Sequence, residues 1–245
     1  MNSKSTLALI GCNAPLEVAK KLERLGFKTC ILRKDIRLPS PVASHADMLL
    51  FNIKDRIFAN SEYIQQNESL FSLLSEYGYS VTPCHNAVSD KYPNDIAFNV
   101  ARIGSCLYGN ISHNAAEIID YAKKNGIEAI NVKQGYAKCS TVILGDKAII
   151  TADSTISDAA EKNGISVLKI ENSPSAIHLL GYDYGFLGGA CGAFERKIYF
   201  VGDISTHPSG VDIVNFCHVY GFETVSVLDG QLTDIGGIIF LPPLA

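Results

Sequence analysis

Residues 141–170, TVILGDKAIITADSTISDAAEKNGISVLKI, contain one complete copy of the unit from which this chain is built. The β-rich runs at 141–144 and 148–151 are separated by a Gly-Asp pair, which is typical of a tight hairpin turn. Asp153 then suits a helix N-cap, and Gly164 suits a helix C-cap because glycine adopts positive φ at little cost. A third apolar run follows Gly164. The stretch therefore predicts a strand–strand–helix–strand unit.

The glycine that ends the helix of this unit recurs, each time followed by a large apolar residue. The five copies are Leu25-Gly26-Phe27, Tyr77-Gly78-Tyr79, Asn125-Gly126-Ile127, Asn163-Gly164-Ile165 and Tyr220-Gly221-Phe222. The segments before them carry apolar residues at helical spacing, and short β-rich runs follow them. Pairs of β-rich runs precede four of the helices, at 48–53 and 56–59, 96–101 and 106–108, 141–144 and 148–151, and 192–194 and 197–201. Four complete units are therefore expected.

The fifth unit is split between the two ends of the sequence. Its first strand is expected at 238–241, and its remainder is a strand at 6–10, Asn13 as a helix cap, and a helix at 16–25. Because one unit takes its halves from opposite ends, the units should close into a ring, which protects the sheet edges. We predict a single α/β domain over residues 1–245, a five-bladed α/β propeller of five ββαβ units. The alternative is an ordinary mixed α/β sheet with coincidental glycines.

The composition is that of a globular chain. It has 245 residues, of which 47% are hydrophobic and 19% charged, and its apolar runs fall short of the ~18 residues of a membrane span. A formal net charge of −4 without a basic cluster disfavours nucleic acid and membrane as partners. The seven cysteines are scattered without a C-x-x-C motif, which favours free thiols in the cytoplasm over disulfides or zinc. No cofactor is expected, because the glycines match neither nucleotide-binding fingerprint. The oligomeric state is left open, and a homodimer is compatible with the sequence.

Five ββαβ units in a ring resemble the fold of the guanidino-group-modifying enzymes, the penteins. These include arginine deiminase, dimethylarginine hydrolase, agmatine deiminase and the amidinotransferases, and the non-catalytic translation initiation factor six shares the architecture. The resemblance covers the whole chain and extends to an uncharacterised bacterial family of that fold, with segments like His45-Ala46-Asp47, Lys138-Cys139-Ser140-Thr141, Ile150-Thr151-Ala152-Asp153 and Ile235-Gly236-Gly237. It implies chemistry on a cationic, guanidino- or amidine-bearing small molecule, although a fold alone does not establish a function.

In such a ring the first strand of every unit begins near the central axis. This brings together the segments at 45–47, 94–95, 138–139, 188–191 and 233–234, which carry three aspartates, two thiols, an imidazole and an ammonium group. A carboxylate accepts two N–H bonds from a planar guanidinium, so the set suits a cationic substrate. The residues expected to bind it are Asp95, Asp234, Lys138 and Cys191.

Cys139 is the candidate nucleophile, because Lys138-Cys139-Ser140-Thr141 is similar to the cysteine-containing strand start of deiminases. A protonated His45 and the charge of Lys138 would lower the pKa of its thiol, although the side chain of Lys138 is expected to point to the opposite face of the strand. His45 and Asp47 lie two residues apart and would project from the same side of a strand, as a general acid/base beside a carboxylate. The alternative is that Cys139 is a small buried apolar residue and His45 a solvated cap.

The sequence departs from the catalytic penteins in two respects. They usually carry the nucleophilic cysteine in the last unit, where residues 232–237 have none, and a histidine in a middle unit, whereas His45 belongs to the first full unit. Two hypotheses follow: a Cys-dependent hydrolase or amidinotransferase in which Cys139, His45 and Asp47 are catalytic, or a non-catalytic pentein-fold binding protein. The glycine-rich loop at 181–192 is expected to cover the mouth of the site, and Cys191 is a second candidate thiol.

Overall fold

Small sheets of identical strand order make up the molecule. The structure, a computed structural model, describes residues 4–171, 173 and 175–244, and in this part of the chain five sheets have three strands each. The sheets are β17 (Ile239–Leu241), β1 (Leu7–Gly11), β2 (Lys28–Leu32); β3 (Leu50–Ile53), β4 (Arg56–Asn60), β5 (Ser80–Cys84); β6 (Ala101–Ile103), β7 (Cys106–Gly109), β8 (Glu128–Asn131); β9 (Thr141–Leu144), β10 (Ala148–Thr151), β11 (Ser166–Lys169); β13 (Cys191–Phe194), β14 (Lys197–Phe200), β15 (Glu223–Ser226). In all five sheets the central strand pairs antiparallel with the first strand named and parallel with the third. The α/β class predicted from the sequence is confirmed.

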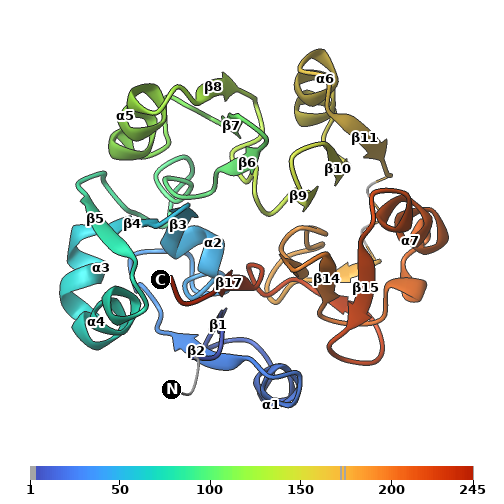
Figure 1. Cartoon of the computed structure of the whole chain (residues 1–245), viewed down its shortest axis with the longest axis horizontal. Helices are drawn as coiled ribbons and strands as arrows, with labels where there is room; N and C mark the ends of the chain where they lie inside the picture. Colours follow the sequence, from blue (N-terminus) through green and yellow to red (C-terminus); the bar gives the residue numbers. More distant parts are fainter. Residues whose placement is uncertain (1–3, 172, 174, 245) are drawn as a thin grey trace.

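Helices connect each central strand to its parallel neighbour. They are α1 (Leu16–Arg24), the pair α3 (Ser61–Gln66) and α4 (Glu68–Glu76), α5 (Ala116–Lys124), α6 (Ser154–Lys162), and the 3-10 turn η1 (Ile204–Thr206) with α7 (Gly210–Val219). Figure 1 shows these helices on the outside of the molecule, with the sheets placed around its middle. The glycines predicted to end the helices all have positive φ, at Gly26, Gly78, Gly126, Gly164 and Gly221. These glycines therefore act as the C-terminal signals that the sequence indicated.

The two ends of the sequence meet in one sheet. Leu7 pairs with Leu241 and Leu9 with Ile239 in the antiparallel ladder of β1 and β17, while β1 runs parallel to β2. Asn13, however, does not cap the helix that follows, because Pro15 occupies the N-cap position of α1. The side chain of Asn13 instead donates to the backbone carbonyl of Pro41, at 3.2 Å. Asn13 thus fastens the neighbouring loop rather than the helix.

Two predicted strands begin later than expected. Residues 46–49 form a short helix, α2 (Ala46–Leu49), so β3 starts only at Leu50. Residues 96–100 form turns, with the N–H of Asn99 donating to the carbonyl of Ile96 at 3.0 Å. Both segments are continuously buried, and a continuous apolar run does not separate a strand from a buried turn. His45 and Asp47 consequently do not lie on a strand, and the reason given for their shared direction is wrong.

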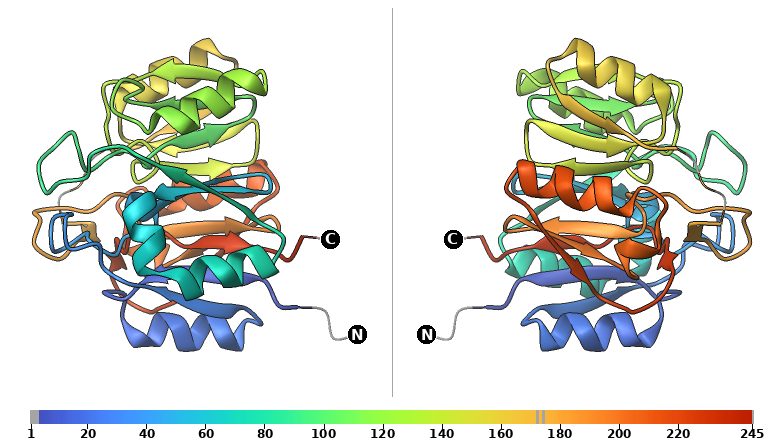
Figure 2. Two further views of the ribbon diagram at one scale, coloured as in Figure 1. Left: turned by 90° about the vertical axis from the view of Figure 1, so that its left-hand side faces the viewer. Right: turned by 90° about the vertical axis from the view of Figure 1, so that its right-hand side faces the viewer.

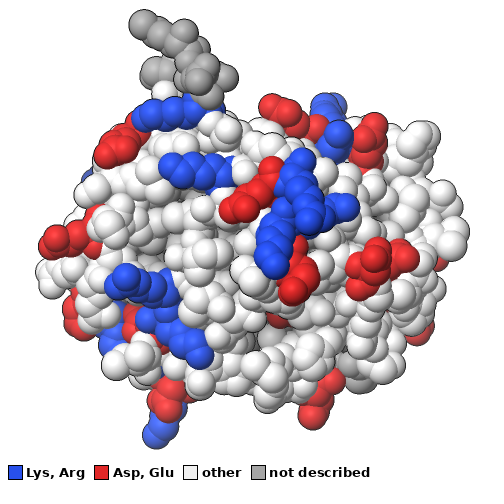
Figure 3. Space-filling model, turned by 90° about the horizontal axis from the view of Figure 1, so that it is seen from below, with Lys and Arg blue, Asp and Glu red and all other residues white. Residues whose placement is uncertain are grey.

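Helix α1 illustrates how each helix is held. Val18 and Leu22 lie on one face and are fully buried against the sheets, whereas Lys20 and Lys21 lie on the outer face with Arg24. Burial of one such leucine contributes roughly 1.5–3 kcal/mol. On the outer surface seen in Figure 3, lysine and arginine side chains are interspersed with aspartate and glutamate. That face therefore presents charges of both signs.

Three long loops extend on the side of the molecule away from the ends of the chain (Figure 2). They connect β2 to α2 (residues 33–45), β5 to β6 (residues 85–100), and β11 to β13 (residues 170–190); the last loop includes the short strand β12 (Ile177–His178), which pairs with β16 (Leu232–Thr233). No helix within the described residues is long and apolar enough to cross a lipid bilayer. Loops on a rigid scaffold are a common place for binding residues, so a binding site is expected on this side of the molecule.

Candidate functional site

A cavity of about 220 Å³ opens among these loops. The glycine-rich loop supplies much of its wall, as the sequence indicated. The remainder comes from α2 and the segment before it, from the segment before β9, and from the residues that follow β12 and β16. The lining residues are Val42, His45, Met48, Tyr136, Cys139, Leu179, Tyr182, Asp183, Tyr184, Phe186 and Asp234. Three residues predicted for the site, His45, Cys139 and Asp234, therefore share one cavity although they are far apart in the sequence.

Cys139 is held by two side chains from other units. Its thiol donates to Asp47 Oδ2 at 3.0 Å, and Asn99 Nδ2 donates to its Sγ at 2.9 Å. The backbone positions the thiol through a turn before β9, in which the N–H of Ser140 donates to the carbonyl of Tyr136. Cys139 is only 4% exposed. The sulfur is thus fixed between a carboxylate and an amide at the wall of the cavity.

Asn99 is the residue that the sequence reasoning missed. It is fully buried, and its Oδ1 accepts from the N–H of Lys138 at 2.8 Å and of Cys139 at 3.2 Å. One amide therefore aligns both the backbone and the sulfur of the candidate nucleophile. The signal for it was an asparagine within the apolar run at 96–100, because a buried amide requires hydrogen-bond partners.

Burial sets the protonation states of this pair. It raises the pKa of Asp47 to about 7, against an opposing effect of the Lys138 charge. Burial, together with the charges of Asp47 and Asp234, raises the pKa of the Cys139 thiol well above its usual value. The prediction that nearby cations lower the pKa of this thiol is therefore wrong. At neutral pH the sulfur is protonated and donates to Asp47.

His45 supplies no positive charge to the site. Its Nδ1 lies 3.9 Å from Asp234 Oδ1, which would be an ion pair only if the imidazole were protonated. Burial lowers the pKa of His45 by more than the charge of Asp234 raises it, so the ring is neutral at neutral pH. His45 occupies the N-cap position of α2. Two residues later, the backbone N–H of Asp47 donates to the carbonyl of Gly236 at 3.2 Å, which holds this helix against the segment after β16. A neutral imidazole can accept or donate a proton there.

Asp234 fastens the loops around the cavity. Its Oδ2 accepts from the N–H of Phe186 at 2.8 Å, and its Oδ1 accepts from the N–H of Gly236 at 2.9 Å. A Cβ at Gly189 would overlap the Asp234 carboxylate, and a Cβ at Gly236 would overlap His45. The small residues in these two segments therefore allow the histidine and the carboxylate to approach the backbone.

Gly236→Ala should lower the free energy of unfolding by about 1–3 kcal/mol, because the added methyl group overpacks the His45 ring. The φ of Gly236 is +77°, so part of any loss comes from backbone strain. Gly230→Ala is the matched control, since Gly230 has a φ of +82° and open space at its Cβ position. Urea denaturation of both variants measures the difference. Equal losses would show that contact with His45 does not constrain Gly236.

Asp47 contacts Cys139 without lining the cavity itself, and three other predicted residues lie outside it as well. Asp95 lies behind it, with its Oδ2 accepting from the hydroxyl of Tyr136 at 2.6 Å. Lys138 and Cys191 line a separate hollow of about 440 Å³, and the Lys138 ammonium donates to the carbonyl of Gly188 at 3.2 Å. Burial raises the pKa of the Cys191 thiol to about 12. Within the described residues no cluster of three His, Cys, Asp or Glu side chains has the geometry to hold a metal ion.

Comparisons with known proteins identify the fold. Residues 9–239 match the profile of a family of unknown function (DUF6873), and no curated protein shows significant sequence similarity. Among solved structures, DDAH from Pseudomonas aeruginosa, a cysteine-to-serine mutant complexed with citrulline, is 11% identical with a TM-score of 0.58, over 97% of this chain and 99% of that one. The amidinotransferase SxtG from Microseira wollei is 10% identical with a TM-score of 0.57, over 99% and 96%.

Agmatine deiminase from C. jejuni is also similar, at 10% identity with a TM-score of 0.53, over 92% of this chain and 88% of that one. All three are similar over nearly their whole length, so the likeness concerns the complete architecture. The pentein fold recognised from the repeated unit is confirmed. At this level of identity the likeness establishes the fold, and the chemistry depends on the site itself.

Proposed function

We propose that this chain, which belongs to the family of unknown function DUF6873 and has the pentein fold, is a Cys-dependent hydrolase or amidinotransferase. Its substrate is a cationic small molecule bearing a guanidino or amidine group. The observation that carries the proposal is the position of Cys139, whose sulfur lies at the cavity wall between the carboxylate of Asp47 and the amide of Asn99. The complex of DDAH with citrulline supports it by analogy.

The proposal includes the ring predicted from the sequence. In it, each three-stranded sheet is one blade of a five-bladed propeller, and the pairing of β17 with β1 completes the blade that is split in the sequence. The free thiols of all seven cysteines suit a reducing compartment, so we place the protein in the cytoplasm. A homodimer remains compatible with this function, and the reaction needs no cofactor.

In the proposed reaction Asp47 is the general base. A carboxyl group with a pKa of about 7 can take a proton near neutral pH, and it already accepts the hydrogen bond from the thiol. As the proton moves to Asp47, the sulfur of Cys139 bonds to the central carbon of the guanidinium. The C=N electron pair moves onto nitrogen, giving a tetrahedral adduct. Asn99 donates to the sulfur and stabilises the charge that develops on it.

His45 completes the proton transfer. His45 takes the proton from Asp47 and gives it to the nitrogen of the leaving amine as the C–N bond breaks, so Asp47 is again a carboxylate. A thiouronium adduct on Cys139 remains. Water, or a second amine, then attacks the same carbon and gives a proton to His45. The C–S bond breaks, and the sulfur takes this proton back from His45; when water attacks, the protonated urea product releases its remaining proton to solvent. Asp234, which lines the cavity beside His45, balances the charge of the bound cation.

Alkylation by a matched pair of reagents tests the proposal. 2-Chloroacetamidine carries an amidinium cation and 2-chloroacetamide is its neutral counterpart, and both lose the same chloride. Cys139 should react at least about tenfold faster with the amidine, because the site binds that cation and orients it. Cys191, which lies outside the cavity, should show no such preference. Peptide mass spectrometry measures both rates, and equal rates at Cys139 would contradict the proposal.

A second candidate function is supported by the buried thiol. Cys139 is almost inaccessible and its pKa is raised well above the usual value, which is typical of an unreactive cysteine. In this alternative the chain is a non-catalytic protein that binds a small cation in the same cavity. Cys139→Ala would then retain full ligand binding, and the wild-type protein would form no covalent adduct.

A further inference from the structure

We propose that the cavity selects guanidines or amidines that carry an apolar group and no carboxylate. This inference rests on the proposed function, and it concerns the part of the substrate away from the reacting carbon. It follows from the charges of the cavity wall, from the positions of the nearby cations, and from the aromatic rings at the mouth.

The cavity wall is acidic and offers no cation. Its described lining includes Asp183 and Asp234 but neither lysine nor arginine, and Asp47 lies directly behind the thiol of Cys139. His45 is neutral at neutral pH because burial lowers its pKa. A carboxylate that leaves water needs a cation or several N–H donors to replace its hydration. A substrate carboxylate would meet like charges here instead.

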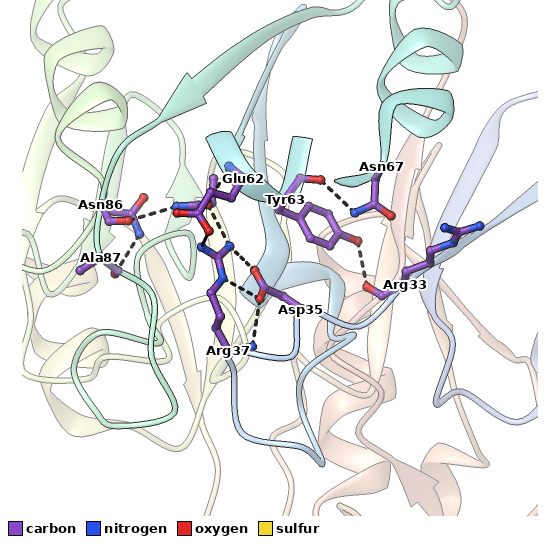
Figure 4. Close-up of polar contacts among 9 residues, drawn as sticks. Arg33, Asp35, Arg37, Glu62, Tyr63, Asn67, Asn86 and Ala87 are labelled. Atoms are coloured by element: carbon purple, nitrogen blue, oxygen red, sulfur yellow. Dashed lines mark hydrogen bonds and ion pairs between the residues drawn. The ribbon is translucent and has the colours of Figure 1, made fainter. Parts of the chain in front are cut away.

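Two cations that lie near the lining residues in the sequence, Lys138 and Arg37, are engaged elsewhere. Lys138 precedes Cys139, but its ammonium donates to the carbonyl of Gly188 and lines the other hollow. Arg37 belongs to the loop that carries Val42 and His45 into the wall. Figure 4 shows its guanidinium beside the carboxylates of Asp35 and Glu62. The guanidinium donates to Asp35 Oδ2 at 2.6 Å, to Glu62 Oε2 at 2.7 Å and to Asn60 Oδ1 at 2.9 Å. Arg37 is therefore already paired with carboxylates of the protein and is not available to bind a substrate carboxylate.

Aromatic rings form most of the remaining wall. The ring centroids of Tyr136 and Phe186 are 6.2 Å apart, and those of Tyr184 and Phe186 are 5.7 Å apart. The hydroxyl of Tyr136 is tied to Asp95, which fixes the orientation of its ring. The faces of such rings attract a guanidinium, and the rings also bury apolar surface. The wall therefore suits a cation with an apolar group attached.

The apolar surface continues outside the cavity. Tyr182 and Tyr184 line the wall and are still 47% and 42% exposed, and Leu180 on the same loop is 62% exposed. Tyr92, from the loop after β5, packs next to Tyr136 at a centroid distance of 6.0 Å and is itself 53% exposed. Contiguous exposed apolar residues commonly mark a binding surface. We assign this rim to the apolar group of the substrate.

Three guanidines with the same four-carbon chain test the inference. n-Butylguanidine, agmatine and 4-guanidinobutanoate differ in the far end group, which is a methyl, an ammonium or a carboxylate group. Calorimetry with the Cys139→Ser protein measures their binding without turnover. n-Butylguanidine should bind at least about tenfold more tightly than 4-guanidinobutanoate. Tighter binding of agmatine than of n-butylguanidine would overturn the apolar assignment.

A charge reversal at the mouth gives a second test. Asp183 is exposed, so Asp183→Lys should leave the fold unchanged and bring a cation to the wall. The preference for n-butylguanidine over 4-guanidinobutanoate should then fall about tenfold. Asp229→Lys, at an exposed site that lines a different hollow, is the control and should leave the preference unchanged. An unchanged preference in Asp183→Lys would contradict the inference.

The outcomes separate this inference from the proposed function. If all three guanidines bind, and the carboxylate compound binds as tightly as the others, only the selectivity for apolar groups is wrong. If no guanidine binds and chloroacetamidine shows no preference for Cys139, the proposed function itself is wrong, and the selectivity is overturned with it.

Discussion

Cys139→Ser should reduce kcat/KM for a guanidino substrate by about 1000-fold or more. A serine hydroxyl can still donate to Asp47, so the site should keep its structure, but it is a far weaker nucleophile than the thiol it replaces. Cys217→Ser is the matched control, because Cys217 is also a fully buried thiol but lies in α7. It should leave kcat/KM within a factor of about two, since it lies outside the site.

Release of ammonia or amine from the substrate measures both variants, and circular dichroism verifies that they are folded. If Cys139→Ser retains a tenth or more of wild-type activity, Cys139 is not the nucleophile. If Cys191→Ser loses activity instead, the reactive thiol lies in the other hollow. Asp47 is then not the general base, and Asn99 does not stabilise the nucleophile.

Asp47→Asn should make the protein more stable than the wild type at pH 8 and not at pH 4. The pKa of Asp47 is about 7 in the folded protein, against 3.8 for the ordinary carboxyl group. Because the folded-state pKa is raised, the stability that this group contributes is complete below pH 3.8 and is lost as the pH rises through 7. At 1.36 kcal/mol per pKa unit the full loss is about 4 kcal/mol. Asparagine keeps an acceptor for the thiol and has no such loss.

Urea denaturation of both proteins at pH 4, 6 and 8 measures this effect as a difference that grows with pH. Asp229→Asn removes the same charge from an exposed site and serves as the control. A difference between Asp47→Asn and wild type that does not depend on pH would show that the carboxyl group is not protonated by burial. The same variant should lose activity, because the amide cannot take the thiol proton.

The repeated architecture could be predicted from the sequence because its signals are local. A glycine with positive φ ends each helix, and hairpin turns such as the one between β9 and β10 lie within a few residues of both strands. Residues 46–49 and 96–100 could not be assigned correctly in the same way. A continuous apolar run has no period, so it does not distinguish a strand from a buried turn.

The site was only partly predictable, because its contacts join distant parts of the chain. Cys139 and Asp47 were both identified as candidates, but nothing in the sequence indicates that the thiol donates to that carboxylate. The protonation state of Cys139 was even harder to predict from the sequence. Lys138 precedes Cys139 in the sequence, yet its ammonium lines another hollow, and burial dominates the pKa of the thiol. Depth of burial is a property of the folded chain alone.

The ladder between β1 and β17 has a consequence for how the protein is made. Leu7 is translated long before its partner Leu241, so one edge of β1 stays unpaired while the residues between them are made. An open strand edge is a template for pairing with other chains. A ribosome that stops before residue 239 would release a chain with that edge uncovered. Synthesis of residues 239–241 therefore decides whether this edge of β1 is protected from aggregation.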